Sequence, residues 1–356
     1  MMRGERLKPN GQTTLADVAE RAGVSRATAS LVLRDSPLVA RSTRERVQAA
    51  VEELGYVYNR GAATLRAART KAVGLLVPNL ANPFFAEMTA GLDDAFDAAG
   101  YVAFLANTGE SLERQDRFLK RMREQKVDGV VLCPAAGTPL KVLRQLQQWP
   151  MPCVQTLRSV SAREGDYAGS DYALGLEQVT EHLIRLGHRR IAFIGGNRAH
   201  SAMAARHAGF TAAMQRHGLP TDIILKIPLT RRAGADAIGL LLARANAPTA
   251  AVCFNDIVAL GVMVGLQQRG LWPGRDFAVT GVDDLPEAAV NYPALTTVAT
   301  SPREVGAAAA KLLLRRIAEP QGGPERVILP TRLVVRESCG ALISRAVEAE
   351  TVKQAG

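Results

Sequence analysis

From Ala72 onward, apolar runs of strand length alternate with amphipathic stretches of helical length. One set of apolar runs covers 72–77, 101–107, 129–134 and 153–157, and a second covers 190–196, 224–229, 250–255 and 277–283. Strands that are apolar along their whole length are typical of parallel sheets with helices on both faces. The pattern predicts an α/β fold with doubly wound parallel sheets. Two sets predict two similar lobes, with a ligand cleft beyond the carboxyl ends of the strands.

The segment before this pattern, residues 13–58, is different. Three short helices are predicted there, at 15–22, 26–34 and 43–54. Thr14 and Ser42 each stand three residues before an acidic residue, which is the spacing of a capping box, and Ser25 is the expected N-cap of the second helix. Gly23 separates the first two helices. The sequence therefore predicts a small all-α domain.

The first two predicted helices have the helix-turn-helix arrangement, in which the second helix enters the DNA major groove. Charge supports this interpretation, because residues 1–70 carry +5 of the total net charge of +10. A basic terminal module indicates a polyanionic partner, nucleic acid before membrane. An ordinary helical hairpin with a basic surface is the alternative that these two observations leave open.

Composition and motifs exclude several other classes of protein. The 356 residues are 47% hydrophobic and 22% charged, which is a globular composition. The sequence contains no run of 18 apolar residues, which is the length that would predict a membrane span. Its charged N-terminus lacks the apolar core of a secretory signal, so we expect a cytoplasmic protein. The sequence has no metal-ligand spacing and no GxSxG, HExxH or Walker motif, so we expect neither an enzyme nor a bound metal or cofactor.

Seven segments together resemble one known family. They are TTLADVAERAGVSRATASLVL, TRERVQAAVEELGYVYN, AVGLLVPNLANPFFAE, GHRRIAFIGG, FNDIVALG, VTGVDD and ILPTRLVVRES. In this order, over residues 13–340, they are similar to bacterial repressors of the lactose/galactose-repressor (LacI/GalR) family. The resemblance implies a repressor that binds a pseudo-palindromic operator as a homodimer. It further implies that a small effector, a sugar or sugar derivative, binds between the lobes.

The resemblance also implies the domain organisation. A helix-turn-helix domain is expected at 13–58, a hinge helix or linker at 59–70, and a two-lobed core like periplasmic binding proteins at 71–340. We expect an N-lobe of 71–170 and 302–329, a C-lobe of 171–301 and 330–340, a disordered arm at 1–12 and a loose tail at 341–356. A plain sugar-binding protein and an enzyme with the same two-lobed fold are the competing hypotheses.

For DNA, the resemblance implies that the second helix contacts bases through Arg26 and Ala27. Ser25 and Ser30 match positions that contact phosphate, although capping explains Ser25 as well. Leu31 departs from the family, in which arginine is common at this position. Because leucine offers only apolar contact, we expect a different operator sequence.

The hinge helix of the family forms on DNA and enters the minor groove. Leu65 matches the residue that wedges between the central base pairs, and Asn59 and Ala62 match neighbouring contacts. Tyr58 stands where the family usually has proline, which is a departure at the start of this helix. A flexible linker is the alternative for this segment.

For the effector, the resemblance implies five residues: Phe84, His200, Arg206, Asn255 and Asp283. An arginine, an amide and a carboxylate together suit a polyhydroxylated ligand, because each hydroxyl needs both donors and acceptors. Core packing of Phe84, helix capping by Asn255 and a surface position for His200 are the alternatives.

Overall fold

The computed structural model describes residues 13–57, 69–196 and 199–341. The chain divides into two compact units, which meet at Thr70 and Lys71 in the sequence and are described separately. Within these described ranges, no helix is both long and apolar enough to cross a membrane.

The first unit is a three-helix domain. Its helices are α1 (Leu15–Ala22), α2 (Arg26–Leu33) and α3 (Arg41–Glu53). The predicted capping box of α1 is confirmed, since the Thr14 hydroxyl accepts from the Asp17 N–H and the Asp17 carboxylate accepts from the Thr14 N–H. Ser25 caps α2 as predicted, by accepting the Thr28 N–H at 3.0 Å. The fully buried residues between the helices are Val18, Ala29 and Val47.

The start of α3 differs from the prediction. Ser42 does not cap this helix, because α3 already begins at Arg41, after an Ala40 that has no capping side chain. Arg44 in the second turn donates to the Ser36 carbonyl at 2.7 Å and thereby ties the preceding loop to the helix. A contact of this kind between a loop and a helix cannot be predicted from the spacing of capping residues.

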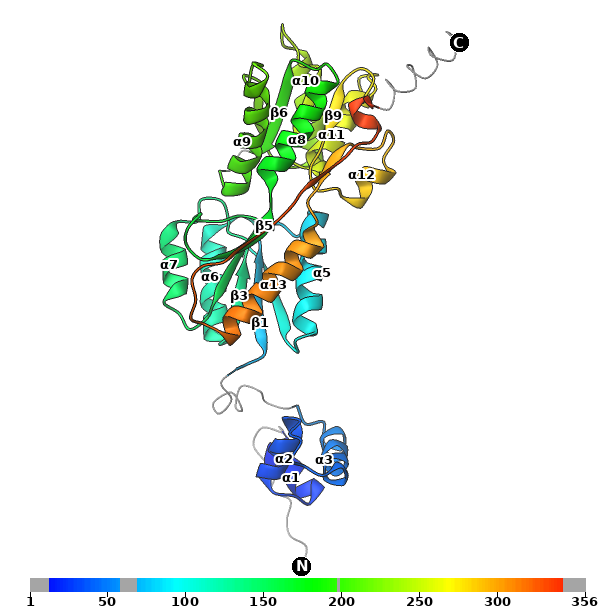
Figure 1. Ribbon diagram of the computed structural model, residues 1–356. Helices are drawn as coiled ribbons and strands as arrows, with labels where there is room; N and C mark the ends of the chain where they lie inside the picture. Colours follow the sequence, from blue (N-terminus) through cyan, green and yellow to red (C-terminus); the bar gives the residue numbers. More distant parts are fainter. Residues whose placement is uncertain (1–12, 58–68, 197–198, 342–356) are drawn as a thin grey trace, which may run out of the picture. The chain divides into compact units, whose positions relative to one another are not determined.

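The second unit contains two sheets of parallel strands, which confirms the predicted α/β class (Figure 1). The larger sheet has the strand order β11-β5-β4-β3-β1-β2 and the smaller one the order β7-β6-β8-β9. The larger sheet consists of β1 (Ala72–Val77), β2 (Val102–Asn107), β3 (Gly129–Leu132), β4 (Cys153–Thr156), β5 (Asp166–Ser170) and β11 (Arg326–Leu329). The smaller sheet consists of β6 (Ile191–Gly196), β7 (Ile224–Ile227), β8 (Ala250–Cys253) and β9 (Ala278–Thr280). We call the part built on the larger sheet the N-lobe and the part built on the smaller sheet the C-lobe.

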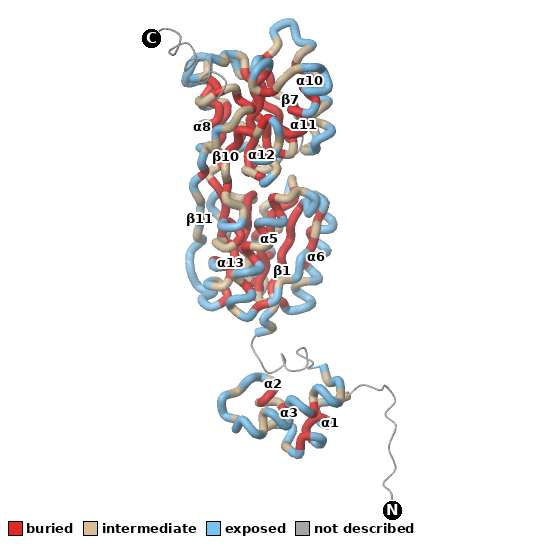
Figure 2. The backbone as a smooth tube through the Cα atoms, turned by 90° about the vertical axis from the view of Figure 1, so that its right-hand side faces the viewer, coloured by how far each residue is buried: buried red, intermediate tan, exposed pale blue. Residues whose placement is uncertain are grey.

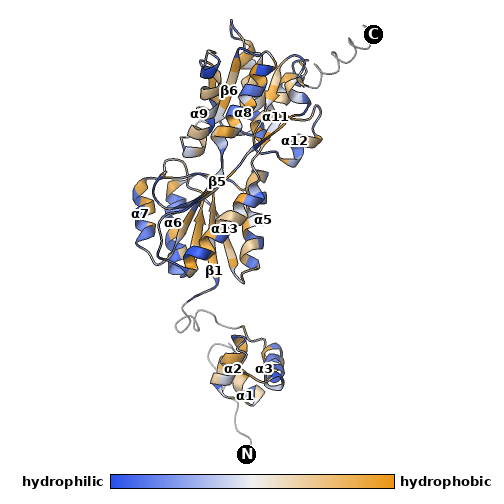
Figure 3. Ribbon diagram, in the orientation of Figure 1, coloured by the Kyte–Doolittle hydropathy of each residue, from blue (hydrophilic) through white to orange (hydrophobic). Residues whose placement is uncertain are grey.

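Helices cover both faces of each sheet. The N-lobe helices are α5 (Pro83–Asp97), α6 (Leu112–Glu124), α7 (Leu140–Gln147) and α13 (Pro302–Ala318); the C-lobe helices are α8 (Tyr172–Arg185), α9 (Ser201–Arg216), α10 (Arg231–Leu242) and α11 (Asp256–Gln267). Because successive strand residues point to opposite faces, Leu75 of β1 packs with α5 and α13, whereas Leu76 packs with α6 and α7. Phe193 and Ile194 divide the C-lobe faces in the same way. The strands β1, β3, β6 and β8 are accordingly buried (Figure 2) and hydrophobic (Figure 3), whereas the edge strands β2, β7 and β11 are partly exposed.

The helices α5 and α13 meet at glycines. A Cβ atom on Gly306 of α13 would lie 2.1 Å from the Met88 carbonyl of α5, and one on Gly91 would lie 2.0 Å from the Arg303 carbonyl. The two backbones therefore touch, and only residues without a side chain fit at the contact.

The chain passes between the lobes three times, after β5, before α13 and after β11. Hydrogen bonds join the crossing segments: Ser170 donates through its hydroxyl to the Thr300 carbonyl at 2.7 Å, and the Asp171 N–H donates to the Leu329 carbonyl at 2.9 Å. The remaining elements lie in the C-lobe or at its crossings: α12 (Pro286–Val290), the antiparallel pair β10 (Thr297–Ala299) and β12 (Arg332–Val334), and a 3₁₀ helix, η1 (Glu337–Cys339).

The strand β5 is missing from the sequence-based prediction. Its five residues, DYAGS, are all buried but do not form an apolar run. The strand lies between β4 and β11, and the Asp166 carboxylate accepts from Arg316 at 2.8 and 2.9 Å. Residues far away in the sequence thus offset the desolvation cost of burying this polar strand. No local sequence pattern reveals such partners.

Candidate functional site

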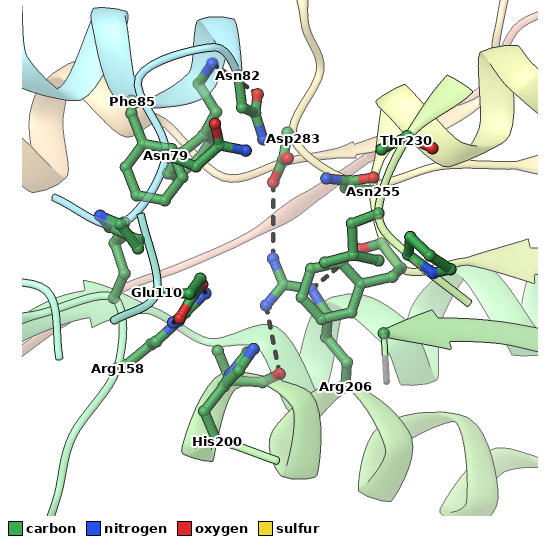
Figure 4. A pocket seen from close by; sticks show the side chains of 18 of the residues that line it. Asn79, Asn82, Phe85, Glu110, Arg158, His200, Arg206, Thr230, Asn255 and Asp283 are labelled. Carbon is green, nitrogen blue, oxygen red and sulfur yellow. Dashed lines mark hydrogen bonds and ion pairs between the residues drawn. The ribbon is translucent and has the colours of Figure 1, made fainter. Parts of the chain in front are cut away.

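A cavity of about 490 Å³ is lined by residues of both lobes of the second unit (Figure 4). Most of the lining segments directly follow a parallel strand, as expected for an α/β protein. The cavity brings together all five residues proposed for the effector: Phe84, His200, Arg206, Asn255 and Asp283. Polar or aromatic lining residues that the sequence analysis did not assign as ligand contacts are Asn79, Asn82, Phe85, Glu110, Arg158, Tyr172, Thr230 and Phe254.

Arg206 lies at the centre of the C-lobe wall and is 4% exposed. Its guanidinium carbon is 3.6 Å from the ring centre of Tyr172 and 4.3 Å from that of Phe254. It also donates to the Phe254 carbonyl at 3.1 Å and to the Ala202 carbonyl at 3.3 Å. Ring stacking and hydrogen bonds therefore hold the guanidinium in one orientation before any ligand arrives.

Asp283 faces Arg206 across the cavity and is also 4% exposed. Its Oδ1 atom has an ion-pair contact to Arg206 Nη2 at 3.6 Å but makes no hydrogen bond to any residue that the structure describes. Burial raises the pKa of Asp283 to about 7, although the charge of Arg206 opposes the shift. The backbone φ of +118° is strained for a residue other than glycine. A buried carboxylate oxygen without a hydrogen bond, on a strained backbone, is typical of a functional position.

Four polar side chains of the lining cap helices that begin at the cavity. Asn82, His200, Thr230 and Asn255 are the N-caps of α5, α9, α10 and α11, and each accepts a backbone N–H at 3.0 or 3.1 Å. Asn79 similarly accepts the Ala81 N–H at 3.1 Å. Each acceptor atom is therefore engaged with backbone, which leaves the amide, hydroxyl or ring N–H group as a donor.

The interpretation of Asn255 as a helix cap is thus confirmed, and capping is compatible with a ligand contact because its amide nitrogen is not the atom that caps. His200 is not a surface histidine. Burial, with the nearby charges of Arg158 and Arg206, lowers the pKa of His200 to about 3. The ring is neutral at physiological pH, and since Nδ1 accepts the Met203 N–H, its proton is on Nε2.

Phe84 lines the cavity and also belongs to the N-lobe core, so its two interpretations are compatible. Its ring packs edge to face against Phe85, with ring centres 5.6 Å apart. Phe85 belongs to the same core cluster and lines the cavity as well.

The most important residues that sequence analysis missed are Glu110 and Arg158. Both oxygens of the Glu110 carboxylate accept from Arg158, at 2.8 and 3.0 Å, and Oε2 also accepts the Ala136 N–H. Arg158 donates in addition to the Pro134 carbonyl at 3.2 Å. Although burial opposes its charge, the Arg158 guanidinium holds the pKa of Glu110 below its ordinary value. The two residues are 48 positions apart, so no local motif could have revealed the pair.

In the first unit, the residues proposed to contact DNA lie on or next to α2. Ser25, Arg26 and Ala27 are exposed at its N-terminus, and Ser30 and Leu31 are half-buried one turn later. Ala29 and Val32 face the core instead. The helix therefore presents its first turn to solvent, which a DNA-reading helix requires. Three further residues proposed for DNA, Asn59, Ala62 and Leu65, lie outside the described residues, as does Tyr58.

Among the described residues, no group of three or more His, Cys, Asp or Glu side chains is arranged to hold a metal ion.

Comparisons with known proteins agree with both units. Residues 14–59 match the model of bacterial regulatory proteins, lacI family, and residues 180–339 match a periplasmic binding protein-like domain. The maltose regulon regulatory protein MalI of Escherichia coli K12 is 35% identical over 90% of this chain and 97% of its own length. The transcriptional repressor PurR of Aliivibrio salmonicida is 33% identical over 86% of this chain and 92% of its own length.

Two solved structures extend the likeness to the fold. A lac repressor dimer bound to operator and the anti-inducer ONPF superposes with a TM-score of 0.82 and 26% identity, covering 93% of this chain and all of that one. A complex of the transcriptional regulator CelR with cellobiose has a TM-score of 0.70 and 33% identity, covering 92% of this chain and all of that one. With a relative this similar over nearly its whole length, the chain belongs to the lacI family of bacterial regulatory proteins.

Proposed function

We propose that this protein is a transcriptional repressor that acts in the cytoplasm as a homodimer on a pseudo-palindromic operator. A sugar or sugar derivative, bound in the cavity between the lobes, controls its affinity for that operator. The relatives support each part, since the lac repressor structure is a dimer on operator DNA and the CelR structure contains cellobiose. The exposed first turn of α2 supplies the groups that would contact bases and phosphates.

The observation that carries the effector proposal is the unpaired Oδ1 atom of Asp283, in a cavity whose other polar groups mostly donate. A sugar hydroxyl placed there would donate to Asp283 and accept from Arg206 at the same time. Other hydroxyls would accept from the amides of Asn79, Asn82 and Asn255. A chain of hydroxyls that ends at a carboxylate satisfies donors and acceptors together.

Control of DNA binding requires that the ligand prefer one of two arrangements of the lobes. The ligand shifts the equilibrium only by its difference in affinity for the two states. We propose that the two lobes change their angle, and that the segment 59–70 transmits this change to the helix-turn-helix domain 13–58. The direction of the response, release or tightening, follows from which state the ligand prefers.

Two measurements on the full chain test the proposal. Selection from a random DNA library yields the operator, and fluorescence anisotropy then measures its affinity with and without each member of a sugar panel. A pseudo-palindromic site whose affinity changes with one class of sugar is the expected result. Thermal unfolding identifies the ligand independently, because a ligand at about 1,000 times its Kd stabilises the folded state by about 4 kcal/mol. Failure to select any DNA sequence would contradict the repressor function.

A further inference from the structure

The charged groups in the cavity wall are matched in pairs. The charged or titratable side chains among the described lining residues are Glu110, Arg158, Tyr172, His200, Arg206 and Asp283. Burial raises the pKa of Tyr172 to about 12, so its phenol is uncharged at neutral pH. Glu110 neutralises Arg158, Asp283 faces Arg206, and His200 is uncharged. Where Asp283 is ionised, above about pH 7, the described part of the wall therefore offers an anionic ligand no cation that is without a counter-charge.

Without Glu110, Arg158 would be the cation available to an anionic ligand. Its side chain is 10% exposed, and both of its Nη atoms donate to the Glu110 carboxylate. A ligand phosphate or carboxylate would have to displace Glu110 and leave that carboxylate unpaired in a largely buried position, which is costly. Glu110 thus occupies the place that the anionic group of a charged ligand would take.

Arg206 is equally engaged. The rings of Tyr172 and Phe254 lie 3.6 and 4.3 Å from its guanidinium carbon, and two backbone carbonyls accept from its Nε and Nη1 atoms. Its remaining Nη2 atom lies 3.6 Å from Asp283. The helix N-termini around the cavity are weaker substitutes for these cations, because the neutral caps Asn82, His200, Thr230 and Asn255 each occupy one first-turn N–H.

We propose that Glu110 is a specificity-determining residue: by neutralising Arg158, it makes the cavity accept uncharged polyhydroxylated ligands and reject their phosphorylated or carboxylated forms. This inference rests on the proposed function, because it concerns the same cavity. It adds that the effector is a free saccharide rather than a sugar phosphate or sugar acid.

Charge changes at the pair test the inference in both directions. The probes are glucose, glucose 6-phosphate and glucosamine, and binding is measured by thermal unfolding and calorimetry on the full-length protein. Glu110→Gln exposes the charge of Arg158, so its affinity for glucose 6-phosphate should exceed that of the wild type by at least about tenfold. Arg158→Gln exposes the charge of Glu110 and should gain glucosamine instead. The criterion is the change relative to the wild type, so glucose need not be the natural effector.

Two controls separate this effect from others. The double variant Glu110→Gln/Arg158→Gln contains a neutral pair and should gain neither charged probe. Arg198→Gln is tested in parallel, because this arginine stands two positions before His200 and lies outside the described residues. The inference is overturned if the wild type binds glucose 6-phosphate more tightly than glucose. This holds whether or not Arg198→Gln removes that binding.

Each remaining outcome also supports or contradicts the inference. If Glu110→Gln folds and gains no affinity for glucose 6-phosphate, the inference is wrong; if it does not fold, the glucosamine response of Arg158→Gln decides in its place. Should both single variants fail to fold, the preference of the wild type between glucose and its charged derivatives is decisive. Operator binding is measured on the same preparations. If the variants bind operator and their ligand selectivity is unaltered, only this inference is contradicted. If the wild type binds no operator, the proposed function is contradicted.

Discussion

Arg206 Nη2 and Asp283 Oδ1 lie 3.6 Å apart, close enough to attract as ions but too far apart to hydrogen-bond. Both side chains are buried, and Arg206 is held in place by rings and carbonyls that do not depend on Asp283. The separation leaves Oδ1 available to a ligand hydroxyl that also accepts from the guanidinium. We therefore expect this incomplete ion pair to have a larger role in ligand binding than in stability.

Replacing this carboxylate should abolish the effector response. Asp283→Asn retains the shape and tolerates the positive φ, but it offers a neutral acceptor in place of a charged one. We expect sugar affinity to fall about 10- to 150-fold, which corresponds to the loss of a hydrogen bond to a charged group worth about 1.5–3 kcal/mol. Operator affinity without sugar should be unchanged. Asp236→Asn, at a carboxylate that is 70% exposed on α10, is the matched control. A normal response of Asp283→Asn would refute the assignment.

Sugar affinity should increase with pH through neutrality. The pKa of Asp283 is raised to about 7 in the free protein by burial, so at pH 6 most molecules carry the protonated acid. A ligand hydroxyl that donates to the carboxylate stabilises the ionised form, and binding is therefore roughly tenfold weaker at pH 6 than at pH 8. His200, whose pKa is about 3, does not titrate in this range. Isothermal titration calorimetry across the range checks the slope, which should disappear in Asp283→Asn.

Arg26 should determine one position of the operator. Its guanidinium is exposed in the first turn of α2, where a bidentate contact to guanine discriminates against other bases by about 1–3 kcal/mol. Arg26→Ala should therefore flatten the selected sequence logo at specific base pairs. Arg26→Lys is the control, because it retains the charge for phosphate contact but lacks the planar fork. If both variants select the wild-type logo, Arg26 does not contact bases.

The contact between α5 and α13 should tolerate no added methyl group. In Gly306→Ala the new Cβ would meet the Met88 carbonyl, a backbone atom that cannot move aside alone. We expect the free energy of unfolding to fall by about 1–3 kcal/mol. Gly323→Ala is the control, since its Cβ would meet nothing within 4 Å. Both tryptophans, Trp149 and Trp272, belong to the second unit, so tryptophan fluorescence reports its unfolding directly. Equal stability of the two variants would contradict this packing.

Local features of the structure were accessible from the sequence. The bounds of α1 and its capping box are as predicted, because a cap depends on residues three positions apart. The α/β class followed from apolar runs such as 72–77, which is β1 without any adjustment. Four of the five residues proposed for the effector stand near the ends of strands or the starts of helices, which is why a cavity at the carboxyl edge of the sheets includes them.

Features that depend on distant partners were not accessible. The strand β5 was missed because its polar residues are balanced by α13, whose Arg316 is 150 positions from Asp166. The start of α3 was misplaced because a loop contact, rather than Ser42, precedes it. The pairing of Glu110 with Arg158 was missed for the same reason, since neither residue belongs to a motif.

The sequence by itself therefore determined the family, the alternation of strands and helices and five of the residues that line the cavity. These properties are local, or they are repeated along the chain as periodic burial and capping. Only the tertiary structure decided which charged side chains at the cavity form complete ion pairs with one another. Whether Arg158 or Asp283 has a partner depends on distances of 2.8 to 3.6 Å between segments brought together by two sheets. Charge interactions in a buried cavity depend on such distances, and no linear pattern encodes them.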